Sequence, residues 1–297
     1  MTFEAFLETA WNDHGDRPQE VADRLASSQH VVESAEHVPP FARLVMHVYG
    51  EHLGHWDRGI ELLESLRRLP ASAGSATAAA ALDRNIATLR YAGGDATVLE
   101  PLSAEDRISV LALAASAFSG RNGMKRAIAT YTEALALAEA GLPPQSPALR
   151  ALAVGGNNLA AALEEKADRD DAETAGMVVA ANGGLTYWKR AGTWLEEERA
   201  EYRLTRSLLQ ARMPRDAIAS AQRCIDVCVR NDAPAIETFF GYVVLALAQR
   251  ESGDAAAFAA SRQQALALYE KVPADEQRWC QSDLAQLGNE LGNELGN

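Results

Sequence analysis

The sequence contains few cysteines, few aromatic residues and no long apolar run, and each shortage excludes a class of protein. Three cysteines among 297 residues cannot form a disulfide framework, which indicates a reduced compartment. Aromatic residues make up 6% of the chain and β-branched runs are scarce, which argues against a β-sandwich or barrel. No apolar stretch approaches the roughly 18 residues of a membrane helix, and the N-terminus lacks the basic region of a signal peptide. We therefore expect a cytoplasmic protein with no membrane partner.

Positive charge is also in short supply. The 28 Lys and Arg residues face 41 Asp and Glu residues, which leaves a net charge of −13. Such a surface repels phosphate backbones, so nucleic acid is not an expected partner.

Alanine is abundant instead, with 57 of the 297 residues. Small side chains cost little entropy in a helix and let helices approach closely. Apolar residues recur at spacings of three and four, as in Phe3, Phe6, Leu7 and Trp11, and glycines and prolines separate the periodic segments. The pattern predicts about thirteen helices and no strand.

The helices recur as pairs. The turns inside the apparent hairpins fall near positions 15, 54, 94, 122, 167, 212 and 253, and five of their six separations are close to forty residues. The short interval after position 94 implies a stunted second helix of at most one turn at residues 96–101. A period of this length is typical of helix pairs stacked side by side.

Two stretches carry a family pattern. One is residues 156–163, with Asn-Asn-Leu-Ala, followed by a turn at 165–168. The other spaces Leu111 and Phe118 on a first helix and Tyr131 on the second. The chain resembles degenerate tetratricopeptide (TPR) repeats similar to those of kinesin light chains, over roughly residues 40 to 270. The resemblance implies an all-α fold, a right-handed α-solenoid of stacked antiparallel helix pairs in a TPR-like superhelix.

The repeat period predicts one elongated α-solenoid over residues 1–297. Within it we expect divergent N-terminal helical hairpins at 1–75, TPR-like repeats at 76–270, and a capping helix with a frayed tail at 271–297. The tail repeats Gly-Asn-Glu-Leu, and its frequent Gly and Asn weaken a helix.

In the family, the first helix of each pair lines a concave groove, and its polar residues grip a ligand. The resemblance therefore implies Asn158 and Asn85 as groove asparagines, Arg199 and Arg203 as carboxylate-binding residues, and Arg84 beside Asn85. Amide groups both donate and accept hydrogen bonds, and Arg offers a fork to a carboxylate. The alternative for Arg199 and Arg203 is pairing at i, i+4 with the glutamates at 196–198 and 201.

Motifs for catalysis and cofactors are missing. The segment at residues 120–125 does not have phosphate-loop spacing and is expected to be a turn, and no G-x-S-x-G elbow occurs. We expect no catalytic residues and no cofactor.

All six histidines fall within the first 55 residues. A helix running to this point could gather His47, His52 and His55, although Gly54 is expected to end it. Cys224 and Cys228 share a helix face, where small buried residues are the simpler interpretation than a metal or redox pair.

These observations favour a noncatalytic scaffold that binds a protein or peptide in its concave groove. The partner is expected to carry an anionic group or a C-terminal carboxylate. Two alternatives stay open: a self-associating structural or accessory subunit, and a metal- or small-ligand-binding protein that uses the His-rich N-terminal region.

Overall fold

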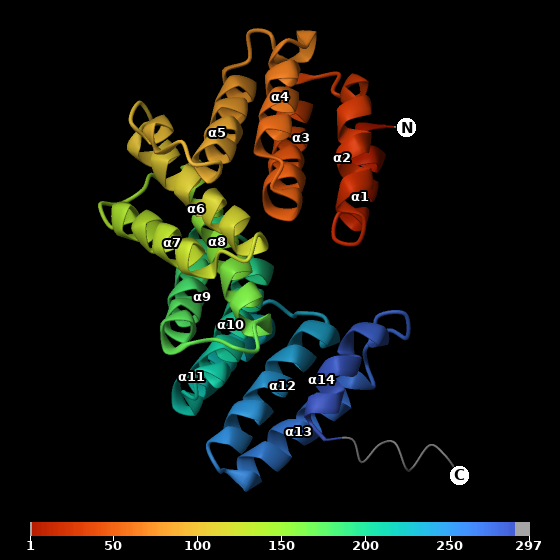
Figure 1. Cartoon of the computed structure of the whole chain (residues 1–297). Coiled ribbons are helices and arrows are strands. Elements are labelled where there is room, and N and C mark those ends of the chain that lie inside the picture. The colour runs from red at the N-terminus through yellow and green to blue at the C-terminus, as the bar shows by residue number, and fades with distance from the viewer. Residues whose placement is uncertain (1, 289–297) are drawn as a thin grey trace. The chain divides into compact units, whose positions relative to one another are not determined.

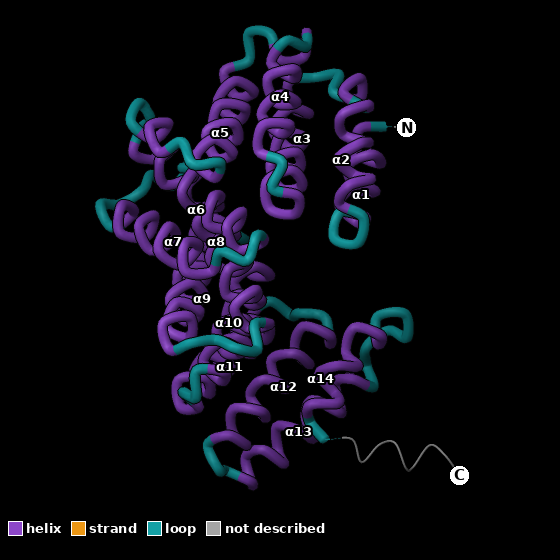
Figure 2. Tube along the Cα trace, viewed as in Figure 1, coloured by secondary structure: helices purple, strands orange, loops and turns teal. Residues whose placement is uncertain are grey.

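A computed structural model describes residues 2–288, and this part of the chain is helical without any strand (Figure 1, Figure 2). The all-α prediction is confirmed there, with fourteen α-helices where about thirteen were expected. The helices are α1 (Phe3–Asp13), α2 (Pro18–Ser27), α3 (Val38–Val45), α4 (Trp56–Arg67), α5 (Ala76–Ala92), α6 (Ala104–Gly120), α7 (Met124–Ala138), α8 (Pro147–Glu165), α9 (Asp171–Ala191), α10 (Trp194–Gln210), α11 (Pro214–Arg230), α12 (Ala235–Glu251), α13 (Ala255–Tyr269) and α14 (Gln281–Gln286).

The predicted turns separate consecutive elements. Those near 15, 122, 167, 212 and 253 join α1 to α2, α6 to α7, α8 to α9, α10 to α11, and α12 to α13. The turn near 94 leads into a single 3₁₀ turn at Ala96–Leu99, the stunted second helix that the short interval predicts. The frayed end predicted for the tail lies, from residue 289 onward, outside the described residues.

Local sequence explains where helices begin. Asp170 and Glu173 form a capping box before α9, with hydrogen bonds of 2.8 and 3.1 Å from each other's backbone amides. Thr193 and Glu196 form the same arrangement before α10. Each box satisfies amides that the first helical turn leaves without intrahelical partners.

One segment departs from α-helical geometry. Residues Met46–Leu53 form a π-helix, which continues directly from α3. Gly54 ends it in the left-handed conformation, with φ of 66°, as the sequence predicts for this glycine.

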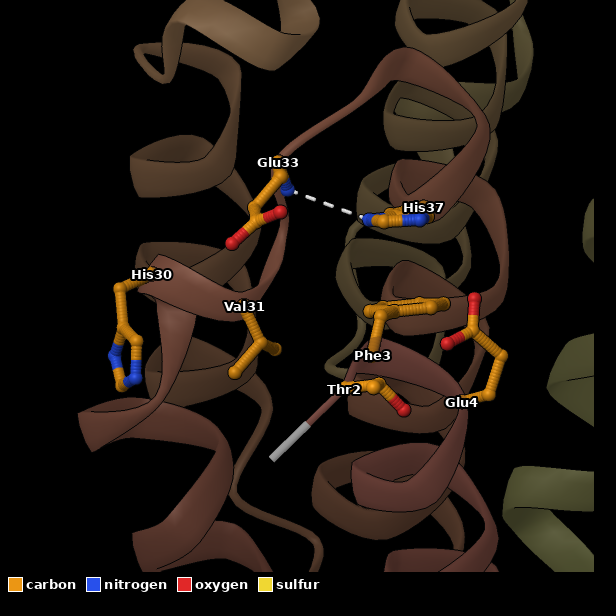
Figure 3. Close-up of a pocket in the computed structure, with 7 residues that line it drawn as sticks. All are labelled: Thr2, Phe3, Glu4, His30, Val31, Glu33 and His37. Atoms are coloured by element: carbon orange, nitrogen blue, oxygen red, sulfur yellow. Dashed lines mark hydrogen bonds between the residues drawn. The ribbon is translucent and has the colours of Figure 1, made fainter.

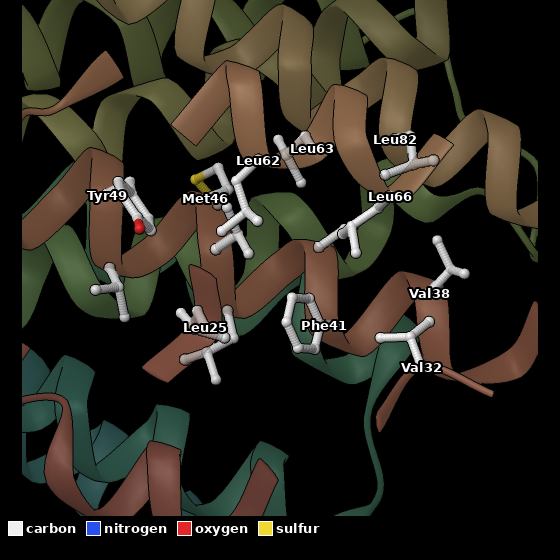
Figure 4. Packing of buried hydrophobic residues seen from close by; sticks show 14 of the residues in the cluster. Leu25, Val32, Val38, Phe41, Met46, Tyr49, Leu62, Leu63, Leu66 and Leu82 are labelled. Atoms are coloured by element: carbon white, nitrogen blue, oxygen red, sulfur yellow. The ribbon is translucent and has the colours of Figure 1, made fainter. Parts of the chain in front are cut away.

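The contacts divide the chain into two compact units, residues 1–155 and 156–297, with the boundary inside α8. The organisation of the whole chain as one elongated stack stays a prediction. In the first unit, the side chains of α3, α4 and α5 and of the π-helix form a continuous core (Figure 4). Phe41, Leu63, Leu66 and Leu82 are fully buried there.

The second unit has its core around α12. This helix packs against α10, α11, α13 and α14. Phe239, Val243 and Ala246 of α12 are fully buried, and Cys280 and Leu284 cover them from the C-terminal segment.

Both small and large residues are fully buried in the helix packing. Ala115, Ala160 and Ala246 have no exposed surface, and the larger Tyr131 and Leu163 are buried as well. Part of the alanine excess is thus used inside the helix packing, and other alanines lie on exposed helix faces. No helix within residues 2–288 combines the length and the apolar character needed to cross a bilayer.

Candidate functional site

A cavity of about 670 Å³ lies in the second unit. Its walls come from α10 and α12, from the start of this unit in α8, and from the C-terminal segment around η6 (Gln277–Cys280) and α14. Polar and aromatic side chains share the lining, which consists of Asn157, Glu198, Arg199, Tyr202, Arg203, Pro234, Ile236, Glu237, Phe240, Glu276, Trp279 and Asp283.

Both predicted arginines of α10 line this cavity. Arg199 donates from Nη2 to Glu237 of α12 at 2.7 Å, and 62% of its side chain is exposed. Arg203 donates from Nη1 to Glu164 of α8 at 2.6 Å and is more covered. Their carboxylate partners come from other helices, so the arginines connect α8, α10 and α12.

Glu198 adds a buried carboxyl to the same wall. It is 1% exposed and accepts a hydrogen bond from the Cys224 thiol at 3.1 Å on Oε1, and its Oε2 has no hydrogen-bond partner within the described residues. Burial raises the pKa of Glu198 to about 8. At neutral pH the group is a protonated carboxyl, which can donate a hydrogen bond.

Tyr202 lines the same cavity together with other aromatic side chains. Its hydroxyl donates to Asp283 at 2.9 Å, and its ring lies 5.8 Å from that of Phe240. Burial raises the pKa of Tyr202, so the hydroxyl stays neutral. Trp279 is 56% exposed at this cavity, an unusual position for a residue type that is usually highly buried.

The predicted groove asparagine of this region, Asn158, is partly buried and does not line the cavity, whereas its neighbour Asn157 does. The two differ by one residue, about 100° around an α-helix. The Asn-Asn pair therefore predicts that one amide lies near the arginines, but the sequence pattern does not distinguish Asn157 from Asn158.

Asn85 and Arg84 belong to the first unit, whereas the arginines of α10 belong to the second. Asn85 is buried on α5 and donates to the backbone carbonyl of Ala81 at 2.8 Å. Arg84 pairs with Asp106 of α6 at 3.3 Å, beside a smaller cavity of about 390 Å³. Asn85 is thus hydrogen-bonded within its own helix, and Arg84 is paired with the next helix.

The cysteines of α11 are both free and buried. Cys224 contacts Glu198, and its contact with Cys228 together with burial raises the pKa of Cys224. A thiol so protonated is a poor nucleophile and a poor metal ligand. The contact between the two thiols lowers the pKa of Cys228. The burial of both residues agrees with their interpretation as small buried helix residues.

At the start of α1, a third cavity, also of about 390 Å³, is bordered by His30 and His37 (Figure 3). The His37 ring stacks on Phe3 with centroids 4.0 Å apart, and its Nδ1 accepts from the Glu33 amide at 3.3 Å. Stacking and hydrogen bonding together fix His37 as a packing residue.

Three other histidines are gathered in a way that the sequence did not predict. His14 joins His47 and His52, and one ligand atom from each lies within 4.8 Å of the others. His55 is outside this group, beyond the turn at Gly54. Burial, and then the charge of His47, lowers the pKa of His52.

The two units define a helical-repeat protein built from consecutive paired helices. No protein-family model and no curated protein sequence matches this chain. Among solved structures it is similar to the nearly identical TPR-like repeats of a Podosopora anserina protein assigned to the kinesin light chains, with 12% identity and a TM-score of 0.49 over 80% of this chain and 96% of that one. A point-substituted form of those repeats gives 13% identity and a TM-score of 0.48 over 89% and 99%. Those repeats are of the type that the sequence motifs resemble.

Proposed function

We propose that this chain is a noncatalytic scaffold that holds a peptide segment of a partner protein in the cavity of its second unit. The observation that carries the proposal is the meeting of Arg199, Arg203 and Asn157 with aromatic side chains on one cavity. Its volume of about 670 Å³ lies within the usual range for ligand sites, about 300–1,000 Å³.

The donors around the cavity favour an acceptor-rich ligand. Arg199 keeps an exposed guanidinium, Asn157 offers an amide, and Glu198 carries a proton at neutral pH. A carboxylate can accept from all three types of group, and charge-assisted hydrogen bonds are about twice as strong as neutral ones. We infer that the partner presents an anionic group, such as a C-terminal carboxylate, with an apolar side chain next to it for Phe240 and Trp279.

The burial of both thiols of α11 supports a noncatalytic role. Cys224 is buried behind Glu198, and its raised pKa keeps it a thiol rather than the reactive thiolate. The free state of all three cysteines suits the reducing cytoplasm expected from the sequence.

Peptide binding can be tested with a matched pair of ligands. A peptide selected from a library with free C-termini is made as the carboxylate and as the amide, and both are titrated by fluorescence polarisation. We expect the amide to bind at least tenfold more weakly, since a hydrogen bond to a charged group contributes about 1.5–3 kcal/mol.

Arg199→Ala should remove most of the difference between carboxylate and amide, whereas Arg215→Ala, at an exposed position of α11, should leave it unchanged. Equal binding of both peptides to the wild type, or full binding by Arg199→Ala, would show that the cavity is not a carboxylate site. Light scattering on the same samples separates peptide binding from self-association.

A further inference from the structure

His14, His47 and His52 meet in the first unit although 33 residues separate the first two in the chain. His14 caps the C-terminal end of α1, and the other two lie in the π-helix. The ring centroids are 4.8 Å apart for His14 and His47, 5.1 Å for His14 and His52, and 4.8 Å for His47 and His52. Nε2 of His47 lies 3.1 Å from Nε2 of His52.

The π-helix explains why His47 and His52 face each other. Residues five apart are about 140° apart around an α-helix, because each residue turns it by about 100°. A π-helix is bonded from i to i+5, so residues at this spacing lie much closer to one face than they do in an α-helix. Such segments occur frequently at functional sites.

Two of the rings are oriented by partners on their other nitrogen. Nδ1 of His14 is hydrogen-bonded to the carbonyl of Trp11, and Nδ1 of His47 lies 2.8 Å from Oε2 of Glu51. A carbonyl and a carboxylate accept, so both Nδ1 atoms carry the proton and both Nε2 atoms carry a lone pair. A carboxylate behind a histidine is the usual outer partner of a metal-bound imidazole.

The surroundings limit the access of water. The side chains of His47 and Glu51 are 15% and 19% exposed. The Trp11 ring packs against both His14 and His47, with centroid distances of 5.1 and 5.2 Å. Trp11 therefore covers the rings of His14 and His47 on one side, which shields them from water and holds them in place.

We propose that His14, His47 and His52 form a binding site for one zinc ion, with three imidazole ligands and a fourth position for water. Zinc accepts imidazole nitrogen at about 2.0–2.1 Å in tetrahedral geometry, which puts ligand atoms about 3.3 Å apart. The 3.1 Å between the Nε2 atoms of His47 and His52 is close to that edge. On binding, the proton of His52 moves from Nε2, where it faces Nε2 of His47, to Nδ1. The ligand atom of His14 lies within 4.8 Å of the other two.

The bound ion links the end of α1 to the π-helix. His14 is the only one of the three ligands at the end of α1, whereas His47 and His52 both belong to the segment Met46–Leu53. Binding therefore joins two elements that are separate in sequence. This role is independent of the peptide cavity in the second unit.

The test uses the full chain without a histidine tag, freed of metal by a chelator and titrated with Zn²⁺ in a calorimeter. We expect one equivalent to bind. His14→Gln, His47→Gln and His52→Gln should each lower the affinity at least tenfold. His30→Gln, at an exposed histidine outside the group, should leave it unchanged. Glu51→Gln should lower the affinity about 10–100-fold, the usual effect of losing an outer partner.

Titration of the wild type with Co²⁺ gives a readout that needs no variant. A tetrahedral site with three imidazoles should produce strong visible absorption at one equivalent, which Zn²⁺ then abolishes. Failure to bind either ion stoichiometrically would overturn the proposal. Equal zinc affinity of His14→Gln and His30→Gln, with both folded by circular dichroism, would also overturn it.

Discussion

Arg223 of α11 donates from Nε to Oε1 of Glu201 of α10 at 2.9 Å, and the Glu201 side chain has no exposed surface. Lys189 of α9 lies 3.0 Å from the same oxygen, and the hydroxyl of Ser220 donates to Oε2 at 2.8 Å. Glu201 thus connects three consecutive helices of the second unit through one carboxylate. It also supplies a partner for both cations, which are themselves about half exposed.

Glu201→Ala should lower the free energy of unfolding of the second unit by about 2–4 kcal/mol, because it removes several charge-assisted hydrogen bonds and leaves a small void. Urea denaturation followed by circular dichroism measures this change. Arg223→Ala is the matched control and should cost about 1 kcal/mol or less, since Lys189 and Ser220 still satisfy the carboxylate. Equal losses for the two variants would contradict a central role for Glu201.

Glu198 makes the stability of the second unit depend on pH. It faces Cys224 and Cys228 of α11 and Glu237 of α12, and burial raises its pKa from 4.5 to about 8. Between these two values the folded chain holds a proton that the unfolded chain has released. Stability contributed by this group is therefore lost as pH rises through this window.

Glu198→Gln should remove that loss, because the amide keeps the shape of the protonated carboxyl without a group that ionises. We expect the melting temperature of the variant relative to wild type to be higher at pH 8.5 than at pH 6, by an amount equivalent to about 1–3 kcal/mol. Glu197→Gln, at the neighbouring and more exposed position, is the control and should show no such trend. A constant difference between Glu198→Gln and wild type over this pH range would refute the proposed ionisation.

The helices and turns were predictable because they depend on local pattern. Periodic apolar residues place the helices, and Gly54 ends its segment through the left-handed conformation that glycine adopts readily. Arg199 and Arg203 could be placed on one face by their spacing alone. What spacing could not supply is their partners, Glu237 and Glu164, which reach them only through tertiary packing.

The histidine cluster shows the same limit more sharply. Its signal in the sequence was the crowding of histidines near the N-terminus, but α-helical geometry directs attention to His52 and His55. The π-helix changes the spacing that brings side chains together, and it pairs His47 with His52 instead. His14 comes from another helix, so its place depends on how α1 packs and not on any local spacing.

Gly120, the last residue of α6, touches the backbone of the π-helix. A Cβ at this position would lie 2.5 Å from the carbonyl oxygen of Glu51, and that backbone cannot give way as a flexible side chain can. Gly120→Ala should therefore destabilise the first unit by about 1–3 kcal/mol, as overpacking does. Because Glu51 contacts His47, the same variant should also weaken zinc binding.

Thermal unfolding measures the effect of Gly120→Ala, and Gly15→Ala serves as its control. Nothing lies within 4 Å of a Cβ at Gly15, so that variant should change stability by no more than about 0.5 kcal/mol. If both alanine variants unfold at the wild-type temperature, the close approach of α6 to the π-helix does not occur in solution.

Arg212, in the turn between α10 and α11, adopts the left-handed conformation, with φ of 58°. The turn after α12 places Gly253 in the same region, with φ of 82°, at no steric cost. For a residue with a Cβ this conformation costs about 1–2 kcal/mol. The side chain of Arg212 is exposed, so replacing it removes no core packing.

Arg212→Gly should therefore stabilise the second unit by about 0.5–1 kcal/mol, after the greater freedom of glycine in the unfolded chain offsets part of the relief. Asn122, in the turn between α6 and α7, has nearly the same φ of 59°, but asparagine tolerates this region well. Asn122→Gly should thus leave stability almost unchanged. Urea denaturation of both variants makes the comparison, and a loss of stability in Arg212→Gly would mean that its side chain contributes more than its backbone strain costs.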